Sequence, residues 1–146
     1  MLQYTEVHEK TDDILEGLLN VWESSVKATH LFLSEEEIGK IKRYVPQALR
    51  GVPHLLVAAE NGVPVAFAGI DGQTLAMLFV SAGKRGRGIG KKLLEMAVEG
   101  YAVNALTVNE QNPQAVGFYE HMGFRACKRS DVDAQGGPYP VLHMQK

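Results

Sequence analysis

The sequence predicts a mixed α/β fold in one domain, and three observations support this prediction. Two dipeptides typical of tight β-hairpins, Asn61-Gly62 and Asp71-Gly72, separate three apolar runs, which predicts a meander of strands over residues 54–80. Segments on both sides of this meander have apolar residues at helical spacing. A chain of 146 residues suits one domain, and no repeat, linker or low-complexity tract divides residues 1–146.

The N-terminal part predicts one strand and two helices. Residues 2–8 alternate weakly between polar and apolar side chains, and residues 14–26 follow with apolar side chains at helical spacing. Ser34 and Glu37 form the capping-box pattern of a second helix, in which Pro46 predicts a kink or a break.

The C-terminal half predicts two helices and three strands. A helix over residues 88–101 precedes a short apolar strand at 105–108. Asn112 caps the next helix, Pro113 takes its first position and Gly123 ends it. The last two strands are expected near residues 124–130 and 139–145. The expected order is β-α-α-β-β-β-α-β-α-β-β, a central, mostly antiparallel twisted sheet of six or seven strands with helices on both faces.

Composition and charge exclude several classes of protein. The hydrophobic share of 45% and the charged share of 22% are those of an ordinary soluble domain, and a net charge of −2 argues against a non-specific nucleic-acid binder. The N-terminal segment is acidic, so we expect no signal peptide, and no window reaches the roughly 18 apolar residues of a membrane span. We therefore expect a cytoplasmic monomer or homodimer with no nucleic-acid or membrane partner.

The single cysteine, Cys127, excludes an internal disulfide and a cysteine-based metal site, and we expect no metal. One cysteine fits a reducing compartment. We expect Cys127 to be a small buried side chain beside Phe124 rather than a nucleophile.

A glycine-rich, basic segment, 79-FVSAGKRGRGIGKKLLEMA-97, joins the meander to the next helix. Backbone N–H groups at a helix N-terminus are unsatisfied and favour anions, and glycines let the backbone approach the anion closely. Residues 84–92 hold five basic side chains and no acidic one. This pattern predicts a site for a phosphate, or for a pyrophosphate on a longer run of N–H groups. The alternative is a glycine-rich loop with solvated charges.

Two common phosphate-binding patterns do not fit this segment. A Walker A loop that ends at Gly90-Lys91 would put its first glycine on Arg85 and its Ser/Thr on Lys92. A dinucleotide fingerprint that uses Gly86 and Gly88 would need its third glycine at Lys91. The spacing therefore argues against an ATP- or NAD-binding protein.

The remaining pattern, R-x-x-G-x-G at Arg85, Gly88 and Gly90, resembles that of the GNAT superfamily of acetyl-CoA-dependent N-acetyltransferases. A second block, 107-TVNEQNPQAVGFYEHMGF-124, resembles the other signature of the superfamily and lies one strand and one helix further on. The matching region runs from about residue 75 to residue 127. The resemblance implies a GNAT-like fold and a direct attack of an amine on acetyl-CoA in a ternary complex.

The resemblance also implies where coenzyme A binds. The loop is expected to hold its pyrophosphate, and the strand before the loop is expected to splay from its neighbour and pair with the pantetheine arm. The cofactor-binding residues implied in this way are Leu78, Phe79, Val80, Arg85, Gly86, Arg87, Gly88, Ile89, Gly90, Lys91, Asn109, Asn112 and Tyr119.

Tyr119 takes the position at which many members of the superfamily place the general acid that protonates the departing thiolate. The alternative is a half-buried tyrosine that packs on the sheet. We expect Asn112 to combine a helix cap with a contact to the coenzyme, whereas Asn109 is expected either to orient the cofactor or to satisfy a strand end. No general base is evident; four residues, Glu23, His30, His54 and His143, are candidates by residue type alone.

The resemblance to the superfamily also implies that the first two helices and the last hairpin shape the acceptor pocket. Residues 22–37 and 129–144 resemble a bacterial branch of the superfamily that is often labelled YjaB-like. The candidate substrate-binding residues are Trp22, Ser25, His30, Phe32 and Tyr139. The alternative is a helix junction packed by Trp22 and Phe32.

The acids of residues 129–144 would suit a cationic primary amine, either a small amine or peptide or a protein lysine or N-terminus. A rival hypothesis from another class is a catalytically inactive regulatory or sensor domain that binds coenzyme A.

Overall fold

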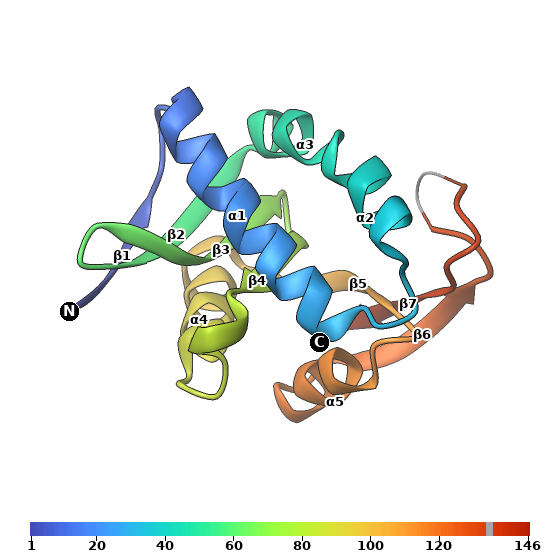
Figure 1. Ribbon diagram of the computed structural model, residues 1–146. Helices are drawn as coiled ribbons and strands as arrows, with labels where there is room; N and C mark the ends of the chain where they lie inside the picture. The colour runs from blue at the N-terminus through green and yellow to red at the C-terminus, as the bar shows by residue number, and fades with distance from the viewer. Residues whose placement is uncertain (134–135) are drawn as a thin grey trace.

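The computed structural model describes residues 1–133 and 136–146, and its centre is a seven-stranded sheet in the order β1-β2-β3-β4-β5-β7-β6 (Figure 1). The elements are β1 (Leu2–Glu6), α1 (Asp12–Thr29), α2 (Glu35–Lys42), α3 (Val45–Gly51), β2 (His54–Glu60), β3 (Val63–Asp71), β4 (Thr74–Val80), the short 3-10 helix η1 (Ala82–Lys84), α4 (Ile89–Tyr101), β5 (Ala105–Asn109), α5 (Pro113–His121), β6 (Arg125–Ser130) and β7 (Val141–Gln145). Neighbouring strands are antiparallel except β4 and β5, which are parallel. The predicted mixed fold is confirmed.

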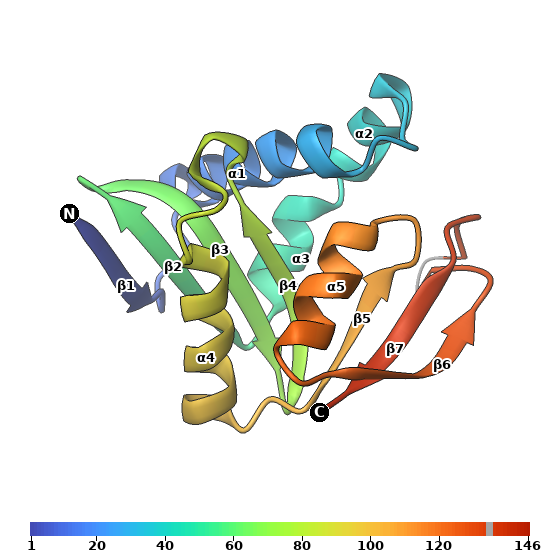
Figure 2. The same cartoon turned by 90° about the horizontal axis from the view of Figure 1, so that it is seen from below.

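Helices cover both faces of the sheet. Helices α1, α2 and α3 lie on one face, and α4 and α5 lie on the other (Figure 2). Each face has its own apolar core: Leu18, Leu49 and Phe67 belong to the first, and Leu94 and Phe124 to the second. The sheet therefore forms the middle of three layers, and a ligand can reach it only where two strands separate or at an edge.

The predicted second helix is two helices. The capping box at its start is present: the Ser34 hydroxyl accepts from the Glu37 N–H at 3.1 Å, and the Glu37 carboxylate accepts from the Ser34 N–H at 2.9 Å. The helix breaks after Lys42, and Pro46 lies in the first turn of α3, where its missing N–H costs no helical hydrogen bond.

Tight turns connect the three strands of the meander. Asn61 and Gly62 have φ angles of 53° and 82°, the left-handed pair that a two-residue hairpin of type I′ requires. The turn at Asp71-Gly72 leads from β3 to β4. The hairpins that the two dipeptides predict are confirmed. The last strand of the meander, β4, ends where the basic glycine loop begins.

Cys127 is exposed, so the expectation of a buried cysteine is wrong. It lies on β6, which is one of the two edge strands of the sheet and has mostly exposed residues. Phe124 is buried because it precedes the strand and packs with α5 and the sheet. Within the described residues, no helix is long and apolar enough to cross a membrane.

Candidate active site

Strands β4 and β5 separate halfway along their length. They pair at two positions only, Thr74 with Ala105 and Leu75 with Leu106. The rest of β4, including residues 78–80, pairs with β3 on its other side. Because the backbone groups of a strand point alternately to its two sides, this half of β4 offers unpaired N–H and C=O groups to the gap. This arrangement is the splay that the resemblance implies for residues 78–80.

A cavity of about 750 Å³ opens beside the free half of β4, between the end of α1, the glycine loop and α5. Every residue predicted to bind the cofactor is among the described residues that line it, apart from Arg87 and Asn109. The cavity therefore joins the two sequence blocks, which are separated in the chain by α4 and β5.

The glycine loop presents a bare helix N-terminus to this cavity. Gly86 and Gly88 have φ angles of 79° and 78°, which side chains rarely adopt, and Gly88 is the N-cap of α4 without a side-chain capping bond. The first turn of α4 holds no acidic residue. Gly90 lines the cavity, with the Val80 side chain 3.4 Å from where its Cβ would be. This concave set of amides with Lys91 fits a pyrophosphate.

Acidic and amide side chains hold the basic residues of the loop in place. Glu60, at the end of β2, accepts from Lys84 at 2.6 Å and from Arg87 at 2.9 Å. Arg87 is therefore turned toward β2, which explains why it does not line the cavity. Arg85 instead reaches α5, where its guanidinium donates to Gln114. The Arg87 and Lys84 hydrogen bonds lower the pKa of the Glu60 carboxyl to about 2.

We expect replacement of Glu60 by glutamine to destabilise the protein in a pH-dependent way. The pKa of this carboxyl is depressed in the folded state, so its contribution is full above the ordinary pKa of 4.5 and is lost as the pH falls toward about 2. The gap in melting temperature between wild type and variant should be widest near neutral pH and should narrow as the pH falls from about 5 toward 2. Thermal unfolding across this range, with Glu99→Gln on the exposed face of α4 as control, measures the gap. A gap independent of pH would contradict the assignment.

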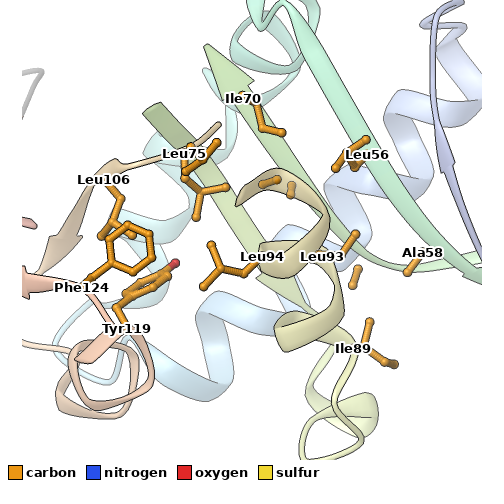
Figure 3. Close-up of a cluster of buried hydrophobic side chains, with 14 of the residues drawn as sticks. Leu56, Ala58, Ile70, Leu75, Ile89, Leu93, Leu94, Leu106, Tyr119 and Phe124 are labelled. Atoms are coloured by element: carbon orange, nitrogen blue, oxygen red, sulfur yellow. The ribbon is translucent and has the colours of Figure 1, made fainter. Parts of the chain in front are cut away.

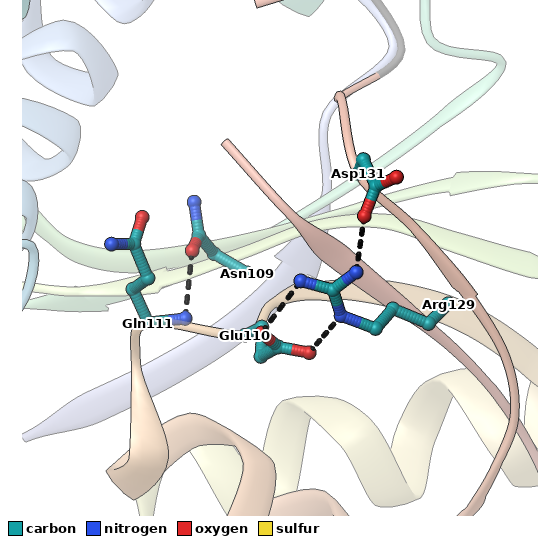
Figure 4. Close-up of polar contacts among 5 residues, drawn as sticks. All are labelled: Asn109, Glu110, Gln111, Arg129 and Asp131. Carbon is teal, nitrogen blue, oxygen red and sulfur yellow. Dashed lines mark hydrogen bonds and ion pairs between the residues drawn. The ribbon is translucent and has the colours of Figure 1, made fainter. Parts of the chain in front are cut away.

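The turn between β5 and α5 is fixed by side-chain caps. The Asn112 side chain accepts from the Ala115 N–H at 3.3 Å, which confirms its capping role, and it lines the cavity. The Asn109 side chain accepts from the Gln111 N–H at 2.9 Å, so it serves the end of the strand. Beside it, the Arg129 guanidinium bonds Glu110 and Asp131 (Figure 4). These contacts tie the start of α5 to β6, the strand beyond β7.

Tyr119 is buried on α5 with its hydroxyl available to a ligand. Its ring packs against Phe118 and Phe124, with centroids 5.2 and 6.2 Å away, and Figure 3 shows it against Phe124. Only 8% of the residue is exposed, and no described residue hydrogen-bonds its hydroxyl. Since no fully buried side-chain oxygen among the described residues lacks a partner, the hydroxyl reaches the cavity. Burial raises the pKa of Tyr119, so the phenol stays protonated at neutral pH.

A second cavity of about 120 Å³ is lined by β4, β5 and residues on either side of them. The residues common to both cavities are His30, Leu78, Phe79, Asn112, Ala115 and Tyr119. Leu78 and Phe79, on the free half of β4, thus line both the large cavity and the small one.

The candidate substrate residues fall into three places. Ser25 and His30 line the large cavity, and His30 lines the small one as well. The Phe32 ring contacts the rings of His30 and Tyr139 in tilted arrangements, with centroids 5.5 and 6.0 Å away. Trp22, on the buried face of α1, is 5% exposed and belongs to the core. It is not among the described residues that line the two cavities.

Six described residues that line the large cavity were not predicted as site residues: Thr29, Lys84, Gln114, Ala115, Phe118 and His121. Ala115 lies four positions before Tyr119, and His121 lies three positions after Phe118, so helical spacing on α5 is a signal for Ala115 and His121. Thr29 and Gln114 have no local signal, because their roles depend on His30 and Arg85.

The comparisons with known proteins agree with this geometry. A family model described as an acetyltransferase (GNAT) domain matches residues 29–146. The chain is 40% identical over 129 residues to the peptidyl-lysine N-acetyltransferase YjaB of Salmonella typhimurium, covering 88% of this chain and 89% of that protein. The solution structure of apo-form YjaB from Escherichia coli is similar, with a TM-score of 0.87 and 37% identity over 99% of this chain and 97% of that one.

A more distant structure extends the likeness in fold. The PaiA N-acetyltransferase from Thermoplasma acidophilum, in complex with coenzyme A, has a TM-score of 0.67 and 20% identity, over 100% of this chain and 99% of that one.

Proposed function

The chain belongs to the GNAT family of acetyltransferases, and we propose that it transfers the acetyl group of acetyl-CoA to the primary amine of a lysine in a peptide or protein. Acetyl-CoA, the cofactor of this family, supplies the acetyl group as a reactive thioester. The observation that carries the proposal is the free half of β4, which lines two cavities that share Tyr119.

The large cavity suits the coenzyme. The bare N-terminus of α4 and the loop glycines hold the diphosphate, with Lys91 and Arg85 as counter-charges. The unpaired backbone of residues 78–80 pairs with the extended arm that follows the diphosphate. A backbone N–H of this strand can also donate to the carbonyl oxygen of the acetyl group as negative charge develops there.

Tyr119 acts on the sulfur side of the reaction. Its phenol is protonated and unbonded, and it can donate to the sulfur as the C–S bond breaks. The desolvation that raises the pKa of the phenol also disfavours a charged thiolate. A proton donor to the departing sulfur is therefore more important in this site than it would be in water.

The acceptor approaches from the side of the small cavity, near the junction of α1 and α2. The first turn of α2 holds three acidic residues, Glu35, Glu36 and Glu37, and Tyr139 donates to the Glu37 carboxylate. Carboxylates attract a lysine ammonium from solution. The peptidyl-lysine acceptor of the relatives at 40% identity supports a lysine over a small amine here.

The test measures acetylation and ligand binding separately. Lysine-containing peptides, N-terminal peptides and small polyamines are incubated with acetyl-CoA, and the products are identified by mass spectrometry. We expect acetylation of lysine side chains. Thermal unfolding with acetyl-CoA, ATP and NAD reports binding: a ligand at a hundredfold over its dissociation constant stabilises the native state by about 2.7 kcal/mol. Stabilisation by acetyl-CoA without acetylation of any amine would favour a sensor domain, and no stabilisation would overturn the cofactor site.

A further inference from the structure

We propose that His30 is the general base of the transfer, with the Nε2 atom of its ring as the proton acceptor and Thr29 as the residue that positions it. This proposal rests on the proposed function and names a role in it.

Two titratable side chains line both cavities within the described residues, His30 and Tyr119. The small cavity has no others among the described residues that line it. An amine that reacts at the free half of β4 must lose a proton there. Tyr119 stays protonated and cannot accept it, because burial raises the pKa of the phenol. Among the described residues that line the small cavity, His30 is the group that remains.

Thr29 fixes which nitrogen of His30 carries the hydrogen. The Thr29 hydroxyl lies 2.8 Å from the Ser25 carbonyl oxygen, one helical turn back, and 2.8 Å from Nδ1 of His30. A hydroxyl has one proton, and a carbonyl oxygen can only accept. When Thr29 donates to Ser25, Nδ1 must carry a hydrogen and donate to Thr29. Nε2 then has a free lone pair, and no described residue bonds it.

The surroundings keep the ring neutral and in place. Desolvation lowers the pKa of His30, so the imidazole is a free base at neutral pH. Phe32 packs against the ring with centroids 5.5 Å apart. His30 is also the C-cap of α1, and its backbone N–H donates to the Val26 carbonyl, so the ring is attached to the end of a rigid helix.

The three other candidate bases are engaged elsewhere. Glu23 pairs with Lys42 at 3.0 Å and with Lys27 at 3.6 Å. His54 bonds Glu6 at 2.9 Å, and His143 bonds Ser130 at 3.1 Å. None of the three is among the described residues that line either cavity.

The transfer then balances in protons and electrons. The neutral amine nitrogen forms a bond to the carbonyl carbon of the acetyl group, and Nε2 of His30 takes the proton that this nitrogen gives up. The C–S bond breaks, and the sulfur keeps the electron pair and receives the phenol proton of Tyr119. The products are an amide and a thiol. Exchange with solvent moves one proton from His30 and returns one to Tyr119.

Kinetics test the role of His30. We expect His30→Gln to lower kcat by about 100-fold or more, with little change in KM for the acceptor peptide and with retained thermal stabilisation by acetyl-CoA. Imidazole should partly restore the rate of His30→Ala. His8→Gln, a change at a side chain that is 79% exposed, is the control. A His30→Gln variant that turns over like wild type would overturn the proposal.

Variants of Thr29 test the positioning. Thr29→Val removes the hydroxyl at nearly constant volume and should lower kcat, whereas Thr29→Ser restores the hydroxyl and should recover most of that loss. Equal rates for the valine and serine variants would remove Thr29 from the mechanism.

NMR of the His30 ring in the wild-type protein tests the proposed tautomer without a measurement of turnover. Long-range ¹H–¹⁵N spectra of the free protein should show His30 neutral at pH 7 with its hydrogen on Nδ1. A hydrogen on Nε2 would overturn the proposal. This result does not depend on the choice of acceptor peptide, because the spectra are of the free protein. If the proposed function itself is wrong, the wild-type protein will acetylate no lysine, whatever the state of the His30 ring.

Discussion

Phenylalanine in place of Tyr119 is expected to lower kcat by about 100-fold or more, because it removes the proton donor to the departing sulfur. Binding of acetyl-CoA should survive, since the loop and the free half of β4 are unchanged. The fold should survive as well. No described residue hydrogen-bonds the hydroxyl, so its removal breaks no bond, and the ring contacts with Phe118 and Phe124 remain.

The measurement for Tyr119→Phe is steady-state kinetics beside thermal unfolding with and without acetyl-CoA. Tyr44→Phe, at an exposed tyrosine that begins α3, is the matched control and should behave like wild type. Unchanged turnover in Tyr119→Phe would assign the residue to packing alone. A loss of turnover together with a loss of acetyl-CoA stabilisation would indicate a binding role and contradict the assignment of a proton donor.

Local signals predicted most of the fold. The dipeptides Asn61-Gly62 and Asp71-Gly72 favour a left-handed backbone at low cost, and the structure uses both as turns of the meander. The capping box depends on two residues three positions apart, and it forms as the pattern predicts. Such features could be predicted because each depends on a few neighbours in the chain.

Burial was harder to predict because it depends on distant elements. The strand around Cys127, 125-RACKRS-130, has three basic residues, as edge strands often do, but its place at the edge is fixed by β7, which inserts between β5 and β6. Trp22 is buried because α1 packs against the sheet, with α3 on the same face. A pattern within one segment does not show which neighbours will cover it.

The candidate site divides in the same way. The loop around Gly88 could be predicted, since a run of glycines before a helix has a direct physical use. The role of His30 could not be predicted, because it depends on a cavity that exists only where β4 and β5 separate. The end of β4 lies about fifty residues after His30 in the chain, and β5 lies further still. The bond from Thr29 that selects its tautomer is invisible until the end of α1 is in place.

Valine in place of Gly90 is expected to lower the affinity for acetyl-CoA by about tenfold or more, which corresponds to about 1.4 kcal/mol. A side chain at this position would project near Val80, whose Cγ2 atom lies 3.4 Å from the position of the new Cβ, and its methyl groups would occupy the mouth of the diphosphate cradle. The backbone amides would remain, but an anion could no longer approach them closely.

The control for Gly90→Val is Gly100→Val in the same helix. Both positions lie in α4, so the two substitutions carry a similar cost in helix propensity, but Gly100 is exposed at the far end of the helix with nothing within 4 Å of its Cβ. Titration of acetyl-CoA by calorimetry should show weakened binding in Gly90→Val and near wild-type binding in Gly100→Val. If both variants bind as wild type does, the diphosphate does not lie at the start of α4. If both weaken equally, the effect comes from the helix and not from the cradle.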